Sequence, residues 1–297
     1  MLTIQEFTEE VVSNLSQRGI KSRPSVVIKN NDVKRTGINI VNDTSKACPV
    51  VYLDEIYDIY KSGKYTVENA VEKVLEIIEN ADCLQYGDII NDILNFESCR
   101  DKVVVNMINK KNNTKNLENK VYRDFLDLAL VYKIMLETSD DVTSTITVTK
   151  DIMESWEVTE DELFEIAMKN TEKMLPIFCK DMADLTEDIV RRVVGPEEYK
   201  ELPNGLMYVV SNKSFNNGAV SILYKDCLKK LADKLETDLV LIPSSIHEII
   251  IINPAEEPVD LEYLNSMISY VNSTQSKVNI LSDHCYFYKR DTDEIVM

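Results

Sequence analysis

The chain has 297 residues, of which 44% are hydrophobic and 28% are charged, and its formal net charge at pH 7 is −18. This composition is typical of a globular protein, and the length predicts about two domains of ordinary size. The negative charge opposes the long-range approach of nucleic acid phosphates and of anionic lipid, so we expect neither nucleic acid nor a membrane as a partner.

Targeting signals and cysteine usage point to one compartment. No run of about 18 apolar residues occurs, and residues 1–16 carry glutamates where a secretory signal would carry lysine before an apolar core. The six cysteines are scattered without a Cys-x-x-Cys pair and mostly lie among apolar residues, which is typical of reduced packing residues. These features predict a cytoplasmic protein.

Residues 1–185 read as an N-terminal α+β unit. Thr3 and Glu6 match the capping box of a helix that ends at Gly19. Thr159 and Glu162 form a second capping box, which begins a helix to about residue 172. The other predicted elements are strands at 25–29, 37–41, 49–53, 103–108, 128–136 and 143–149, and helices at 54–60, 67–80, 86–96 and 117–123.

The segment 186–202 is acidic and helix-forming, and Gly195-Pro196 interrupts it. We interpret it as the join between the N-terminal unit and a C-terminal unit, 203–297.

The C-terminal unit has the clearest pattern. An amphipathic helix is predicted over 219–235, because its apolar residues recur with a 3.6-residue period. Strands are predicted at 206–210, 239–242, 246–252 and 285–288, and a second helix begins at Pro258. The resulting β-α-β-β-α-β order is compatible with a ferredoxin-like sandwich or an open mixed sheet. We therefore predict an α+β protein with mixed or antiparallel sheets and helices on one face.

Three runs carry a family resemblance. They are residues 47–54 with Tyr57 downstream, residues 151–156 leading into Glu162-Leu163, and residues 241–248, which read Leu-Ile-Pro-Ser-Ser-Ile-His-Glu. Together they resemble an uncharacterised family of unknown function found in gut Firmicutes, and the resemblance covers nearly the whole chain. The second and third runs are more distantly similar to the uncharacterised YtpQ family. The resemblance implies no activity, cofactor or catalytic residue.

Ser244, Ser245 and His247 are the candidate catalytic residues. A serine nucleophile needs a base within hydrogen-bond reach, and His247 is one of two histidines in the chain. Strand alternation, however, places His247 and Glu248 on opposite faces, and no glycine elbow surrounds either serine. A polar turn that enters a buried strand is the competing interpretation.

His247 and His284 are the candidate metal ligands. If neighbouring strands brought the two imidazoles together, Asp283 or Cys285 could complete a zinc site. The short paired spacings of known zinc sites are missing, which favours ordinary half-buried histidines.

Two tyrosines are candidate interface residues. Tyr57 and Tyr60 share a helical face, which would bind a partner if exposed and would belong to the core if buried.

Other functional motifs are missing from the sequence. It contains no Walker loop, GxGxxG, HExxH or nucleophile elbow, and its 7 glycines are too few for the familiar phosphate-binding loops. We therefore predict no cofactor. The favoured hypothesis is a binding or regulatory module with a protein partner, and its oligomeric state stays open. The alternative is a hydrolase or metal-dependent enzyme that uses the Ser244-Ser245-His247 turn.

Overall fold

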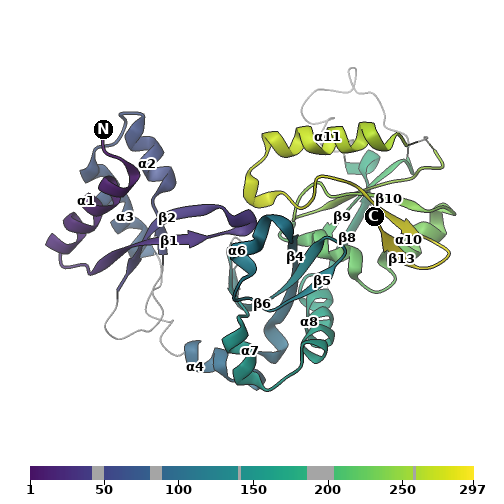
Figure 1. Cartoon of the computed structure of the whole chain (residues 1–297), viewed down its shortest axis with the longest axis horizontal. Coiled ribbons are helices and arrows are strands. Elements are labelled where there is room, and N and C mark those ends of the chain that lie inside the picture. Colours follow the sequence, from purple (N-terminus) through teal and green to yellow (C-terminus); the bar gives the residue numbers. More distant parts are fainter. Residues whose placement is uncertain (42–49, 81–88, 140–141, 186–203, 257–258) are drawn as a thin grey trace. The chain divides into compact units, whose positions relative to one another are not determined.

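The computed structural model describes residues 1–41, 50–80, 89–139, 142–185, 204–256 and 259–297 (Figure 1). The chain forms two compact units, Met1–Ser98 and Cys99–Met297. Every strand pairing in the described residues is antiparallel, and helices accompany each sheet, so the predicted α+β class is confirmed. The predicted join at 186–202 lies outside the described residues, and a division of the chain there stays a prediction.

The first unit packs its helices on a small sheet. The sheet has the order β1-β2-β3. Thr3 and Glu6 form the predicted capping box at the start of α1, and Phe7, Val11 and Leu15 of that helix are fully buried in the core. The elements are α1 (Ile4–Gln17), β1 (Ser22–Ile28), η1 (Asn30–Asp32), β2 (Lys34–Ile40), β3 (Val50–Tyr52), α2 (Asp54–Lys61), α3 (Val67–Asn80), α4 (Ile89–Leu94) and α5 (Phe96–Cys99).

The second unit contains two sheets, of which the first has four strands. Its order is β4-β6-β5, and β7 pairs with β6. All seven residues of β4 are buried, and the backbone N–H of Val105 donates to Thr171 Oγ1 of α8 at 2.9 Å. The elements are η2 (Arg100–Lys102), β4 (Val103–Asn109), η3 (Lys111–Asn113), α6 (Thr114–Leu117), β5 (Tyr122–Phe125), β6 (Leu128–Ser139), β7 (Val142–Thr147), α7 (Lys150–Trp156) and α8 (Glu160–Met174).

The second sheet has six strands in the order β13-β12-β10-β11-β9-β8. Its strands are β8 (Ile177–Asp181), β9 (Met207–Asn212), β10 (Leu239–Ile242), β11 (Ile249–Ile252), β12 (Tyr286–Lys289) and β13 (Glu294–Val296). The helical elements between them are η4 (Gly218–Leu223), α10 (Cys227–Leu235), α11 (Leu261–Thr274) and η5 (Lys277–Asn279). Within the part of the chain that is described, no helix is long and apolar enough to cross a bilayer.

Both faces of the six-stranded sheet are covered, because successive side chains of a strand point to opposite sides. Leu264 and Ile268 of α11 pack with Val240 on one face, and Figure 1 shows α11 beside this sheet. Leu241 and Ile251 have the opposite parity and are fully buried on the other face, where α10 lies opposite β8. The face that carries Leu241 and Ile251 therefore packs against a helix other than α11.

The predicted continuous helix over 219–235 is two elements. η4 is a 3-10 helix that ends at Leu223, and α10 begins at Cys227 after Asp226, whose φ of 57° is left-handed. Residues 218–222 are all buried. Because η4 has no exposed side over these residues, no charged position interrupts the apolar pattern there. The break changes the direction of α10. It leaves intact the 3.6-residue period of apolar residues from which one continuous helix was predicted.

Gly218 lies where the start of η4 meets β9 and the segment before β11. A Cβ built there would lie 2.6 Å from both Asn212 N and His247 O, and closer still to Ser211 Oγ. We expect Gly218→Ala to lower the free energy of unfolding by about 1–3 kcal/mol, because the overpacked backbone must shift. Urea unfolding would measure the loss. Lys213→Ala, an exposed change nearby, is the control, and equal stability of the two variants would contradict the packing argument.

Candidate functional site

The predicted serine turn is held by Glu248. Ser244 Oγ and Ser245 Oγ both donate to Glu248 Oε1, at 2.9 and 3.0 Å. The backbone N–H of His247 donates to Ser245 Oγ at 3.0 Å. The structure thus brings both hydroxyls to the carboxylate, and the hydrogen bonds described for them do not include the imidazole.

The imidazole of His247 contacts two asparagines from distant segments. Its Nδ1 accepts the backbone N–H of Asn217 at 3.1 Å, and its Nε2 lies 3.4 Å from Asn279 Oδ1. An Nδ1 that accepts requires the proton of the neutral ring to be on Nε2, which can then donate to Asn279. This arrangement ties the loop before η4 to η5. The catalytic role of His247 stays a prediction.

His284 lies beside a different set of groups. Its Nε2 is 3.2 Å from Asp127 Oδ2, and its Nδ1 is 3.2 Å from Cys285 O. Asp127 Oδ1 also accepts the hydroxyl of Tyr286 at 2.7 Å, and burial together with this carboxylate raises the pKa of that phenol. Among the described residues, no three His, Cys, Asp or Glu side chains gather into a group that could hold a metal ion. These contacts do not bring the imidazoles of His247 and His284 together. Their predicted role as metal ligands stays a prediction.

The two candidate interface tyrosines pack on the core of the first unit. The rings of Tyr57 and Tyr60 lie 5.3 and 4.9 Å from that of Phe7, centroid to centroid. Tyr57 OH donates to Leu2 O at 2.9 Å, and Tyr60 OH accepts from Leu2 N at 3.3 Å. These contacts hold the start of the chain against α2, and a role in partner binding stays a prediction.

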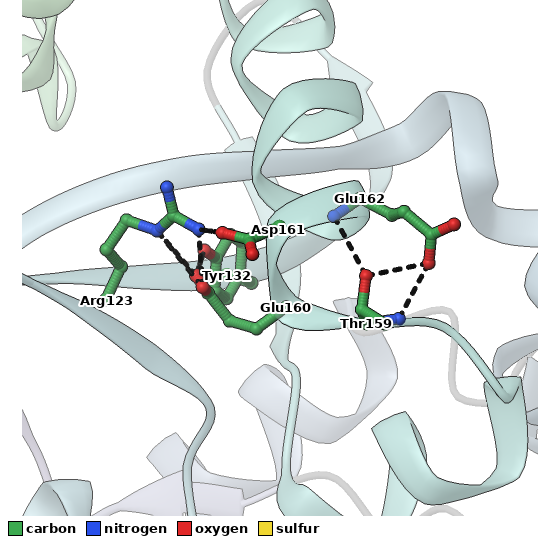
Figure 2. Close-up of polar contacts among 6 residues, drawn as sticks. All are labelled: Arg123, Tyr132, Thr159, Glu160, Asp161 and Glu162. Atoms are coloured by element: carbon green, nitrogen blue, oxygen red, sulfur yellow. Dashed lines mark hydrogen bonds and ion pairs between the residues drawn. The ribbon is translucent and has the colours of Figure 1, made fainter.

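A polar cluster joins the start of α8 to the four-stranded sheet (Figure 2). Arg123 of β5 donates to Glu160 through Nε at 2.9 Å and Nη2 at 2.6 Å, and it also pairs with Asp161. Tyr132 of β6 donates its hydroxyl to Glu160. The guanidinium carbon lies 4.1 Å from the centroid of the Phe164 ring.

This cluster fixes the position of α8. Burial, followed by the Glu160 carboxylate, raises the pKa of the fully buried Tyr132, so the phenol remains a hydrogen-bond donor. Next to it, Thr159 and Glu162 form the predicted capping box, with Thr159 N 2.9 Å from Glu162 Oε2. The bidentate arginine pair and the cap satisfy groups at the same helix end. We therefore assign the cluster to positioning of α8.

A groove of about 650 Å³ lies between β8 and α10 in the second unit. One wall comes from β8 and includes Ile177, Cys179 and Asp181; these alternate residues share a face of the sheet with Tyr208 of β9. The facing wall comes from α10, and further residues complete the lining: Cys227, Lys230, Leu231 and Lys234 of α10, with Glu172, Pro176, Lys180, Asp184, Tyr224 and Lys225. The four α10 residues follow i, i+3, i+4, i+7 spacing, so they form one side of that helix.

Charge in the groove differs from that of the chain as a whole. Four lysines and three acidic residues line it, whereas the net charge of the whole chain is −18. Two of the acids are already engaged by backbone donors: Asp181 accepts the N–H groups of Ala183 and Gly205, and Glu172 accepts that of Lys225. The lining therefore carries one more cationic than anionic side chain, in a chain that is strongly acidic.

Desolvation affects both thiols of the groove. Burial raises the pKa of the Cys227 thiol to about 12, and the neighbouring Cys179 adds to that rise. Cys179 is exposed on β8, and partial desolvation raises the pKa of its thiol as well. Since the thiolate is the reactive form, the Cys227 side chain acts as apolar lining at neutral pH.

Sequence reasoning missed this groove because it missed β8. The run Ile177-Phe178-Cys179 follows Pro176 and is β-prone, but it is short and continues into a charged segment. The signal on α10 was visible, since Cys227, Lys230, Leu231 and Lys234 occur at helical spacing. The strand opposite this helix was not predicted, however. Nothing in the sequence therefore indicated that this side of α10 lines a groove.

The fold is α+β, with a groove of about 650 Å³ between β8 and α10. A family model described as a family of unknown function (DUF5688) matches residues 4–290. The chain belongs to this family. The comparison with curated proteins and the comparison with solved structures each found no match.

Tyr132→Phe tests the cluster of Figure 2. The change removes the hydroxyl that donates to Glu160 while Arg123 keeps its own bonds, so we expect the free energy of unfolding to fall by about 1.5–3 kcal/mol. Urea unfolding measures the loss. Tyr122→Phe on the adjacent strand is the matched control, and an equally small effect in both variants would show that the hydroxyl adds no stability.

Cys227 offers a test of pH dependence. Its pKa is raised from 9.0 to about 12, so a variant that retains Cys227 alone should alkylate slowly, with a rate that keeps rising through pH 9.0 instead of levelling off. Iodoacetamide labelling followed by intact-mass measurement gives the rate. The same variant in denaturant should level off near the ordinary value, and matching profiles for folded and denatured protein would contradict the shift.

Proposed function

We propose that this protein is a binding module and that the β8–α10 groove is its ligand site, with an anionic ligand. The observation that carries the proposal is the groove itself, lined by four lysines in a chain whose net charge is −18. Its volume of about 650 Å³ is that of an ordinary small-ligand site.

The lysines of the groove have weak partners in the structure. Lys234 Nζ lies 5.4 Å from the centroid of the Tyr208 ring, and Lys180 Nζ lies 5.9 Å from that of Phe178. Lys230 Nζ is 3.9 Å from Asp226 Oδ2, at the outer limit of an ion pair. Exposed pairs of this kind contribute little to stability. An anion in the groove would give these cations a closer partner than the fold provides.

The geometry gives less support to the hydrolase or metal-dependent enzyme. Ser244 and Ser245 donate to Glu248, and His247 Nδ1 accepts a backbone N–H. A serine nucleophile would need its own proton to pass to that ring. The enzyme remains the alternative hypothesis, and it would require these hydrogen bonds to rearrange.

We extend the proposal to the cellular location of the protein and to a distant family relation. Cys179, Cys227 and Cys285 are reduced thiols, which supports the cytoplasm as the place where the module works. A distant relation to the YtpQ family is likewise proposed, and the runs at 151–156 and 241–248 support it.

The ligand site is tested with small anionic probes. Citrate, inorganic phosphate and anilinonaphthalene sulfonate should each be assayed for a rise in melting temperature, since a ligand that binds only the native state stabilises it by about 2.7 kcal/mol at a hundredfold excess over Kd. We expect at least one probe to stabilise the wild type and to lose that effect in Lys230→Gln/Lys234→Gln.

The control for this experiment is Lys169→Gln/Lys229→Gln. It makes the same change in net charge at exposed lysines that do not line the groove, and Lys229 lies on the same helix. Equal responses of the two double variants, or no stabilisation by any probe, would contradict an anion site in the groove.

A further inference from the structure

β8 is the outermost strand of the six-stranded sheet. In the residues that the structure describes, β9 pairs with one of its edges and no strand pairs with the other. Three of its five residues are exposed. Such an edge presents backbone donors and acceptors to an incoming strand.

The hydrogen-bond pattern between β8 and β9 shows which residues of β8 direct their backbone N–H and C=O groups away from β9. Pro176 O accepts from Lys213 N at 2.9 Å, and the next residue, Ile177, is registered with Asn212. Bonded and non-bonded pairs alternate in an antiparallel ladder. Phe178 therefore bonds to β9, whereas Ile177 and Cys179 direct their N–H and C=O groups away from it.

The side chains of the same two residues line the groove. Ile177 and Cys179 face α10 across the space where Lys230 and Lys234 lie. A strand added at this edge would place its alternate side chains on the same face, over the groove. One occupant can thus satisfy the backbone of β8 and the lysines of α10 together.

We propose that the ligand is an extended acidic peptide segment of a partner protein, which adds to β8 as an antiparallel strand and directs acidic side chains into the groove. The inference rests on the proposed function, because it assigns a chemical class to the occupant of that site. Addition of a strand to a sheet edge gives affinity through main-chain bonds and specificity through pockets for alternate side chains.

Charge complementarity selects the acidic peptide. Lys225, Lys230 and Lys234 line the groove on the side of α10, so carboxylates entering it would meet a wall that carries ammonium groups. The net charge of −18 acts over longer distances, and at physiological salt the screening length is about 8 Å. The local lysines therefore decide the sign of the interaction once the peptide is in place.

Backbone methylation of a peptide probe tests this proposal. The probe is a fluorescein-labelled hexapeptide of alternating glutamate and valine, titrated with the full-length protein and followed by fluorescence anisotropy. In an antiparallel added strand, the residues with side chains over the groove also donate their N–H groups to β8. N-methylation of the glutamates should weaken binding by roughly tenfold or more, and N-methylation of the valines should leave it unchanged.

Variants of the protein provide the complementary test. Cys179→Pro removes one outward N–H, which an edge strand tolerates, and should weaken peptide binding, whereas Cys179→Ser should not. Lys230→Gln/Lys234→Gln should weaken binding of the peptide, and a lysine-valine hexapeptide should not bind the wild type. The methylated peptides leave the protein unaltered, so they decide the question even if Cys179→Pro fails to fold.

The outcomes separate the two proposals. Stabilisation by small anions with equal affinity for both methylated peptides, or with no peptide binding, would overturn strand addition and leave the anion site standing. If neither small anions nor the peptide bind, both proposals fall. Stabilisation by a small anion together with peptide binding that is lost selectively on glutamate methylation, the stabilisation and the binding both abolished in Lys230→Gln/Lys234→Gln, supports both.

Discussion

The alternation of side chains along antiparallel strands is the constraint on which the second unit depends. Leu241 and Ile251 point to one face of the six-stranded sheet and Val240 to the other, and all three are buried. Each face therefore needs its own cover, to which α11 contributes on one side and α10 on the other. The same alternation carries through β9 to β8, where the cover becomes incomplete, and the groove forms at that place.

Polar groups inside this unit are mostly engaged in holding segments together. His247 O accepts from Ser211 Oγ at 2.7 Å, Asn109 Nδ2 donates to Leu281 O at 2.9 Å, and Glu160 binds both Arg123 and Tyr132. Burying such groups is costly unless they are hydrogen-bonded. Residues that look chemically suggestive in the sequence therefore have structural partners here. The lysines of α10 have longer contacts, since Lys230 Nζ is 3.9 Å from Asp226 Oδ2 and Lys234 Nζ is 5.4 Å from the centroid of the Tyr208 ring.

The sequence predicted those parts of the fold that local rules govern. Thr3 with Glu6 and Thr159 with Glu162 form their capping boxes because the bonds span three residues. The edge strand β8 was not predicted, since an exposed strand of five residues shows neither strict alternation nor a long apolar run. The environment of His247 was equally inaccessible, because its ring partners Asn217 and Asn279 are 30 and 32 residues away. Only the folded chain brings them together.

Two sets of groups meet at the groove, the lysines of α10 and the outward backbone groups of β8, and a small anion cannot contact both sets. An anion of a few atoms could contact Lys230 and Lys234, but it would leave the outward N–H and C=O groups of Ile177 and Cys179 to water. A peptide backbone supplies acceptors and donors at the spacing of the strand, and its side chains reach the lysines from the same residues. Because one short strand presents both features, the geometry favours a ligand that is itself extended. The acidic character of the rest of the chain would oppose association wherever the lysines are absent, so the proposed acidic segment would be confined to this edge.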